Sequence, residues 1–431
     1  MMFGVLIFCF SLIFLVTFIS ILKKDYFFAG FYFFLYVYTI FTQIGYVYFP
    51  ALSDLLKANF GSELFYSYFV FVLLSFLSFY AMFKLFYPIC VRENRYVVVK
   101  ARYNWRAMFY VVIFAHFWVL FAFFLKNYNI LSYHTIVENK TFFHDKQWAY
   151  NCFMINFKLS VFFNFVLYYC YRLRGVFNFK LQTRFFLLII LIIGLLLFAL
   201  ISKKIGNRTD ILALVTAIVF FEINFVRKGD FRKKMVKIGL FVLLVLLWML
   251  LIEHTRGKAV SDFTLAERML FKDYYTPSYI LIAAIKFGYV SFLEVLKSSL
   301  ANILVLIDYP YLQTTITDFF HPGVSSRNTG YAFFIFTEGY VAMGMSGFVY
   351  NGIVVFLYIA LWRNFACSNK SYYNLFMLSL MSSQFANICR SQTSYFIKDI
   401  YMWFIPAMIL LYLIVGIRPS LLRKSMLTTN G

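Results

Sequence analysis

The sequence predicts an all-α polytopic membrane protein. Of its 431 residues, 63% are hydrophobic and only 13% are charged, and the mean hydropathy is +0.77. Apolar runs of 17 or more residues recur along the whole chain. Each of these runs is long enough to cross a hydrocarbon core of about 30 Å at about 1.5 Å per residue. A transmembrane barrel would instead show short segments of alternating hydrophobicity, which the sequence lacks.

The apolar runs predict about eleven transmembrane helices, and more if part of a long loop also enters the membrane. Residues 1–22 lack the basic start and the small-residue cleavage site of a signal peptide, so we expect them to form the first span. The whole chain, 1–431, is predicted to be a single integral membrane domain. The predicted spans are 1–22, 26–49, 63–90, 107–125, 148–171, 185–201, 210–226, 238–253, 346–362, 372–388 and 399–417.

Lysine and arginine counts in the loops predict the orientation of these spans. One set of alternate loops is short and holds 22 cations against three acids, whereas the opposite set holds 16 cations against 14 acids. Cytoplasmic loops carry the excess of lysine and arginine in membrane proteins. We therefore expect the N-terminus outside and the C-terminus inside, and the net charge of +22 is mostly a signal of topology rather than of nucleic-acid binding.

A long outer loop, residues 254–345, is predicted between the eighth and ninth spans. Within it, residues 277–308 are strongly apolar but contain Lys286, Glu294 and Lys297. This part of the loop is compatible with amphipathic helices that lie on the outer surface, and equally with an extra helical hairpin. The hairpin would leave the orientation of the remaining spans unchanged.

Several function classes find no support in the sequence. The six cysteines form no CxxC pair and no disulfide framework, and the histidines show no metal-binding spacing. ATP-binding motifs, internal repeats and a soluble cytoplasmic domain are also missing. We therefore expect no metal and no cofactor, and we expect any chemistry to take place in the membrane or at its outer face.

Outer arginines at the ends of spans are the first candidate site residues. Arg208 in "SKKIGNRTD" precedes a span, where a cation opposes the helix dipole and suggests a nearby anion. Arg256, Arg327 and Arg390 occupy the same predicted face. Arginine binds phosphate oxygens through two parallel hydrogen bonds, so convergence of these residues would suit a diphosphate group. Each arginine taken alone is equally compatible with an ordinary loop position.

The stretch "TGYAFFIFTEGYVAMGMSGFVYNG" contains the second candidate. Glu338 is an isolated carboxylate in an apolar run, where an ionisable residue is costly and is by default functional. It is predicted to orient a sugar hydroxyl or an arginine, or to act as a base, unless it merely pairs with an arginine at the interface. The glycines at 339, 344, 347 and 352 predict close helix packing or a broken helix.

Two outer histidines, His254 and His321, lie near the arginines in the sequence. A neutral imidazole is a suitable general base for a sugar hydroxyl. An ordinary loop position explains each of them as well.

The order of these elements resembles the Wzy-type O-antigen and oligosaccharide repeat-unit polymerases. Members of that family show a G-x-R-like element before a span and an E-x-Y-x-x-x-G-x-x-G-like element after a large outer loop. Gly206 and Arg208 match the first element, and Glu338, Tyr340, Gly344 and Gly347 match the second. The residues between Tyr340 and Gly344 depart from the usual family pattern, and no catalytic base can be transferred from it.

The resemblance implies a lipid-donor glycosyltransferase of the bacterial inner membrane. Its substrates would be undecaprenyl-pyrophosphate-linked oligosaccharides, joined into a surface polysaccharide of the lipopolysaccharide or capsule type. A chain-length regulator and a flippase of the same pathway are implied as partners. Two alternatives stay open: an O-antigen ligase-like transferase with a different acceptor, and a transporter that flips lipid-linked oligosaccharides.

Overall fold

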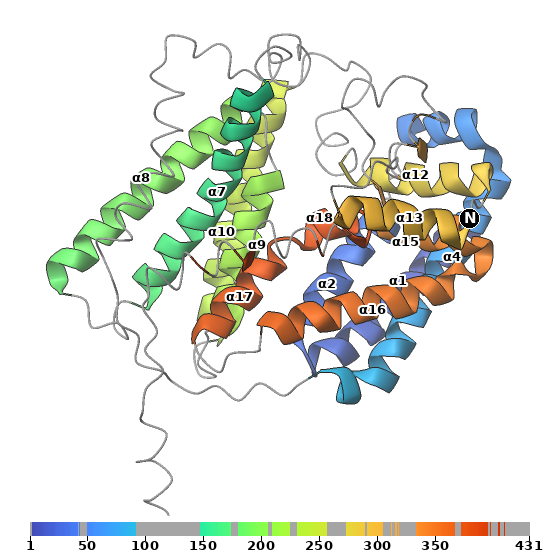
Figure 1. Ribbon diagram of the computed structural model, residues 1–431, viewed down its shortest axis with the longest axis horizontal. Coiled ribbons are helices and arrows are strands. Elements are labelled where there is room, and N and C mark those ends of the chain that lie inside the picture. The colour runs from blue at the N-terminus through green and yellow to red at the C-terminus, as the bar shows by residue number, and fades with distance from the viewer. Residues whose placement is uncertain are drawn as a thin grey trace, which may run out of the picture. The chain divides into compact units, whose positions relative to one another are not determined.

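The computed structural model describes ten stretches of the chain, with a few isolated residues between them. These stretches are 2–41, 50–91, 147–173, 180–205, 209–224, 231–256, 273–288, 291–304, 333–366 and 372–394. Throughout these stretches the secondary structure is helical, without strands. This confirms the predicted all-α class for the described part of the chain (Figure 1).

Within the described residues, four segments are long and apolar enough to cross a membrane. They are Gly4–Leu22, Leu64–Cys90, Leu181–Lys203 and Ile335–Phe365, and two shorter apolar helices cover Tyr26–Thr39 and Val236–Ile252. The chain is therefore an α-helical membrane protein. The count of eleven spans and the orientation stay predictions, and the predicted spans 107–125 and 399–417 fall almost wholly outside the described residues.

The helices divide into two compact units. Unit 1 comprises Met1–Glu93, Val260–Phe365 and Gln384–Met402, and unit 2 comprises Asn94–Ala259, Ala366–Ser383 and Trp403–Gly431. Each unit is therefore assembled from segments that are distant in the sequence.

Unit 1 begins with a helical hairpin. Helix α1 (Met2–Leu22) packs against α2 (Tyr26–Tyr36), which continues as the π-helical turn η1 (Val37–Phe41). Helix α4 (Pro50–Cys90) packs on α12 (Asp273–Phe287), and α12 in turn contacts α15 (Ile335–Met343). Helix α13 (Phe292–Ile303) also packs on α15, and α18 (Phe385–Cys389) packs on α2. Buried aromatic rings fill the space between these helices.

Unit 2 contains α7 (Gln147–Arg172), α8 (Leu181–Ile205), α9 (Thr209–Asn224), α10 (Phe231–Arg256) and α17 (Tyr372–Ser382). Helix α9 packs against both α7 and α17. Helices α7 and α17 also contact each other through aromatic rings, because the ring of Phe376 lies 5.0 Å from the rings of both Phe165 and Tyr169. At the end of α7, Arg172 forms an ion pair with Glu222 of α9, which also accepts a hydrogen bond from Tyr168.

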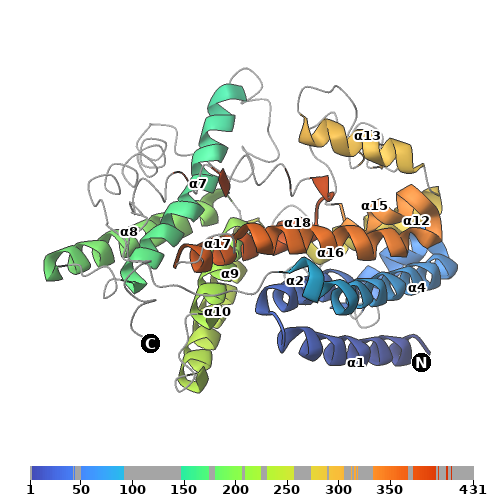
Figure 2. The ribbon, with the colours of Figure 1, turned by 60° about the horizontal axis from the view of Figure 1, so that its bottom comes forward.

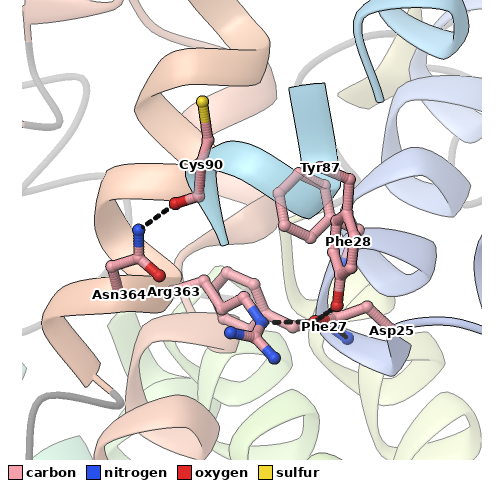
Figure 3. A network of polar contacts seen from close by, with 7 residues as sticks. All are labelled: Asp25, Phe27, Phe28, Tyr87, Cys90, Arg363 and Asn364. Atoms are coloured by element: carbon pink, nitrogen blue, oxygen red, sulfur yellow. Dashed lines mark hydrogen bonds and ion pairs between the residues drawn. The ribbon is translucent and has the colours of Figure 1, made fainter. Parts of the chain in front are cut away.

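A buried ionic cluster ties three helix ends together in unit 1 (Figure 3). Asp25 caps α2 by accepting hydrogen bonds from the backbone N–H groups of Phe27 and Phe28. The same carboxylate pairs with Arg363 of α16 (Gly347–Ala366) and accepts a hydrogen bond from the Tyr87 hydroxyl at 2.9 Å. The exposed fractions of the Arg363 and Asp25 side chains are only 8% and 6%. Charge pairing and capping together offset the cost of burying both groups.

The ionic cluster gathers ends that the topology prediction places on one face of the membrane. Asp25 follows the first span, Tyr87 lies near the end of the third, and Arg363 follows the ninth. Beside them the Asn364 side chain donates to the backbone carbonyl of Cys90. The sequence pattern predicts Asp25 and Arg363 as loop charges, whereas the structure buries them as a pair.

The apolar helix that carries Glu338 begins earlier than the sequence predicted and is broken in the middle. It begins at Ile335 instead of 346, and the 3-10 turn η7 (Gly344–Ser346) separates α15 from α16. Gly344 has a φ of 62°, a conformation that favours glycine. This break confirms that the glycine-rich stretch interrupts the helix.

Glycines also allow the helices on both sides of the break to touch. A Cβ atom at Gly347 would lie 1.9 Å from the carbonyl oxygen of Gly339, and a Cβ atom at Gly352 would lie 1.9 Å from Ser78 Oγ of α4. Asn351 Nδ2 donates to Ser75 Oγ of α4 at 3.1 Å. Helix α16 therefore packs on α15 and α4 at distances that only glycine permits.

The predicted tenth span, 372–388, is interrupted as well. Helix α17 ends at Ser382 and α18 begins at Phe385. The Ser382 hydroxyl donates to the carbonyl of Ser379, and the Ser383 hydroxyl donates to that of Leu380. Serine hydroxyls that bond to preceding carbonyls compete with the helical ladder, which gives a physical reason for the break.

Replacing Arg363 by leucine should strongly destabilise the protein. The change leaves the Asp25 carboxylate buried without its cation, which costs about 3–5 kcal/mol in comparable pairs. Denaturant unfolding in mixed micelles measures the loss. Lys297→Ala is the control, because it breaks an exposed ion pair with Glu294, worth at most about 1 kcal/mol. Equal losses in the two variants would contradict a stabilising role for the buried cluster.

Alanine at Gly347 should also destabilise the protein, by about 1–3 kcal/mol or more, because its Cβ overlaps the backbone of α15. Gly239→Ala in α10 is the matched control. A Cβ there meets nothing within 4 Å, and alanine favours the helix by about 0.5–1 kcal/mol. The same unfolding measurement applies, and a Gly347→Ala variant as stable as the control would rule out the close crossing.

Candidate functional site

Glu338 lies in the first turn of α15 and is completely buried, with 0% of its surface exposed. The position is favourable for a carboxylate, because the N-terminus of a helix carries partial positive charge. Burial of a charged group inside an apolar segment still requires hydrogen-bond donors around it. The surroundings of Glu338 therefore indicate what the residue does.

Three donors from two other segments surround the Glu338 carboxylate. The Tyr350 hydroxyl of α16 donates to Oε1 at 2.9 Å. Thr393 donates twice, through its backbone N–H to Oε2 at 2.8 Å and through its hydroxyl, which lies 2.8 Å from Oε1 and 2.9 Å from Oε2. Ser299 of α13 lies close to the same carboxylate. Glu338 thus joins α15, α16 and the segment after α18.

The segment held by Thr393 is polar and largely buried. It follows α18 and reads Arg390-Ser391-Gln392-Thr393-Ser394. Gln392 is only 1% exposed, and neither its amide nitrogen nor its amide oxygen has a hydrogen-bond partner among the described residues. Buried side-chain amides are normally hydrogen-bonded, so the Gln392 amide has the capacity to bond to a polar group or to water. Such an amide offers both a donor and an acceptor.

Arg390 lies three residues before Thr393 and is half-buried. Three peptide units span at most about 11 Å, so the Arg390 backbone lies near the Glu338 carboxylate. Within the described part of the chain, the Arg390 side chain forms no hydrogen bond or ion pair. Arg390 therefore belongs to the segment that donates to Glu338, but the two side chains form no ion pair in the described part of the chain.

The Glu338 cluster and the ionic cluster of Asp25 lie toward opposite ends of α16. Tyr350 and Arg363 are separated by 13 residues of this helix, or about 20 Å at about 1.5 Å per residue. This separation agrees with the predicted topology, in which Asp25 lies on the inner side and Glu338 on the outer side.

The other predicted site residues are distributed as follows. Tyr340 is buried, and its ring packs edge-on against Phe71 of α4, with 5.2 Å between the ring centres. His254 and Arg256 lie in the last turn of α10, in unit 2, and their side chains are not described. Arg208, His321 and Arg327 lie outside the described residues. The convergence of all four arginines therefore stays a prediction, and among the described residues Arg390 lies in the segment that donates to Glu338.

Sequence reasoning singled out Glu338 and Arg390 but missed Tyr350, Gln392 and Thr393. The sequence does contain a signal for Gln392 and Thr393. The run "RSQTS" places five polar residues between apolar stretches, and only its arginine was used. Tyr350 gives no such signal, because tyrosine is common throughout this chain and its role depends on a helix break that brings it back to Glu338.

No metal cluster occurs among the described residues, where no group of three or more histidine, cysteine, aspartate or glutamate side chains lies close enough to hold an ion. The expected absence of a metal stays a prediction. Comparison with protein-family models, with curated proteins and with solved structures finds no match to the chain.

The hydrogen bonds between Glu338 and Thr393 should give a measurable coupling free energy of unfolding. Thr393→Val removes the hydroxyl donor but keeps the backbone N–H, and the loss of a hydrogen bond to a buried charged group should cost about 1–3 kcal/mol. A double-mutant cycle with Glu338→Gln should give a coupling energy of about 0.5–3 kcal/mol in unfolding experiments.

The control for this cycle is Ser346→Ala, which removes an exposed hydroxyl bonded only to the carbonyl of Met343. Its effect should stay within about 0.5 kcal/mol and should add to that of Glu338→Gln. Strictly additive Glu338 and Thr393 variants would show that the two side chains do not interact.

Proposed function

We propose that the protein is a lipid-donor glycosyltransferase that joins undecaprenyl-pyrophosphate-linked oligosaccharide repeat units at the outer face of the bacterial inner membrane. The observation that carries the proposal is the buried Glu338 carboxylate, which holds the segment containing Arg390 and Gln392. Its place in an apolar helix suits a substrate whose carrier is a lipid. The sequence resemblance to repeat-unit polymerases rests on the same glutamate.

In the proposed reaction, a hydroxyl of the acceptor sugar attacks the anomeric carbon of the donor glycan. A carbon–oxygen bond forms there, the bond to the lipid pyrophosphate breaks, and the pyrophosphate leaves with the electron pair. The hydroxyl proton is taken up by an oxygen of the departing pyrophosphate, so that the step balances. The reaction requires positive charge near the leaving group, and Arg390 supplies it without a metal.

Glu338 acts in this proposal as a positioning residue. All of its described hydrogen bonds go to Tyr350 and Thr393, and its surface is fully buried, so it is poorly placed to accept a proton from a sugar. It instead fixes the segment from Arg390 to Ser394. Gln392 in that segment can donate to one sugar hydroxyl and accept from another.

Deletion of the gene in its host tests the proposed function. Surface glycan that carries only single repeat units on its final lipid is the expected result on a gel. Polymer retained on undecaprenyl would instead identify a ligase, and repeat units trapped on the inner leaflet would identify a flippase. Either of these two results would overturn the polymerase proposal.

Complementation with point variants then tests the site. Arg390→Ala should abolish polymer while the protein inserts at its normal level, and Arg208→Ala and Arg256→Ala should do the same if they share the diphosphate site. Lys180→Ala, an exposed cation on the opposite predicted face, is the control and should restore full polymer. Normal polymer length with all three arginine variants would rule out the diphosphate site.

A further inference from the structure

Helix α13 exposes apolar side chains and buries polar ones, the opposite of a helix that faces water. Its exposed side is apolar and comprises Phe292, Leu293, Leu296 and Leu300, followed by Leu304 at the C-cap, with exposed fractions of 42–57%. Its inner side carries Ser298, which is 1% exposed, and Ser299, which lies near the Glu338 carboxylate. A surface helix of a soluble protein would turn the leucines inward and the serines outward.

The inner side of α13 is fixed by specific contacts. The Ser298 hydroxyl accepts a hydrogen bond from the backbone N–H of Leu312 at 2.7 Å, and Val295 and Ala301 are buried beside it. Ser291 caps the helix by accepting from the backbone N–H of Glu294. These contacts fix which side of α13 faces the protein. The leucine side is therefore the side that the fold leaves exposed.

The leucine face adjoins an exposed apolar stripe on a candidate membrane span. Helix α13 packs on α15, and the Phe292 ring lies 6.2 Å from the Tyr350 ring of α16. Both contacts fall within the span Ile335–Phe365. Along α16, exposed apolar side chains recur every four residues at Val349, Ile353, Leu357 and Leu361. Figure 2 shows α13 on the side of α15 and α16 that faces away from α1.

The length of α13 excludes a transmembrane role. Its 12 residues extend over about 18 Å at about 1.5 Å per residue, which is well short of a hydrocarbon core of about 30 Å. One edge of the helix carries Lys297, paired with Glu294 at 3.2 Å, and both residues are solvent-accessible. A short helix with a leucine face and a charged edge fits the boundary between acyl chains and head groups.

We propose that α13 lies in the membrane interface, with Leu293, Leu296 and Leu300 buried in the acyl chains of the bilayer and Ser298 and Ser299 facing the Glu338 cluster. The occupant of the leucine face is lipid hydrocarbon. In this arrangement helix α13 lies between the buried Glu338 carboxylate and the bilayer. This placement selects the first of the two alternatives that the sequence left open for residues 277–308, an amphipathic helix on the outer surface, over a spanning hairpin.

Fluorescence quenching in liposomes tests this placement. Single-cysteine variants of the full-length chain, with the six native cysteines replaced, carry a bimane label at Leu296→Cys, Leu300→Cys or Lys297→Cys. The liposomes consist of phosphatidylcholine with a fraction of doxyl-labelled phosphatidylcholine. We expect the doxyl lipid to quench the labels at positions 296 and 300, and aqueous iodide to quench the label at position 297.

Two control positions calibrate the measurement. Leu357→Cys, on the lipid-facing stripe of α16, should be quenched by doxyl lipid, and Val295→Cys, on the buried side of α13, should be quenched by neither reagent. Quenching of positions 296 and 300 by iodide would place the face in water, and no quenching by either reagent would place it against protein. Both results would overturn the proposal. Leu293→Cys replaces any variant that is not monodisperse in detergent.

Discussion

The cost of placing a charge inside an apolar helix bundle is the constraint on which this structure depends. A carboxylate in such surroundings must find donors or a cation, and it finds them on segments that are distant in the sequence. Asp25 binds side chains of α4 and α16, and Glu222 pairs with a side chain of α7. Glu338 accepts hydrogen bonds from α16 and from the segment after α18. Each acid therefore acts as a junction between helices that hydrophobic packing alone would not hold in one register.

The same constraint explains how much the sequence could predict. Hydropathy is a local property, so it predicted the helical class and the position of most helices. Glu338 was identified as exceptional because one acid in an apolar run is visible in a single stretch of sequence. The partners of that acid were not predictable, because Tyr350 and Thr393 reach it only after the break at Gly344 and the turn after α18 have formed.

Charge counting has a related limit. Asp25 and Arg363 counted as one acid and one base in separate loops, but in the fold they neutralise each other inside the protein. The boundaries of two predicted spans also differ from those of the observed helices, for a similar reason. The apolar helix could begin at Ile335 because hydrogen-bond donors compensate for Glu338, and no hydropathy window contains that information. Serine back-bonding in the same way interrupted the predicted tenth span.

The pairing of Asp25 with Arg363 has a consequence for synthesis of the chain. The two residues are 338 positions apart, so at roughly 5–20 residues per second the ribosome delivers the arginine tens of seconds after the aspartate. During that interval the α1–α2 hairpin has its capping N–H groups and, later, Tyr87, but no cation. The first hairpin therefore stays without its Arg363 partner until α16 has been synthesised, and unit 1 is complete only after α18, which packs on α2, has followed.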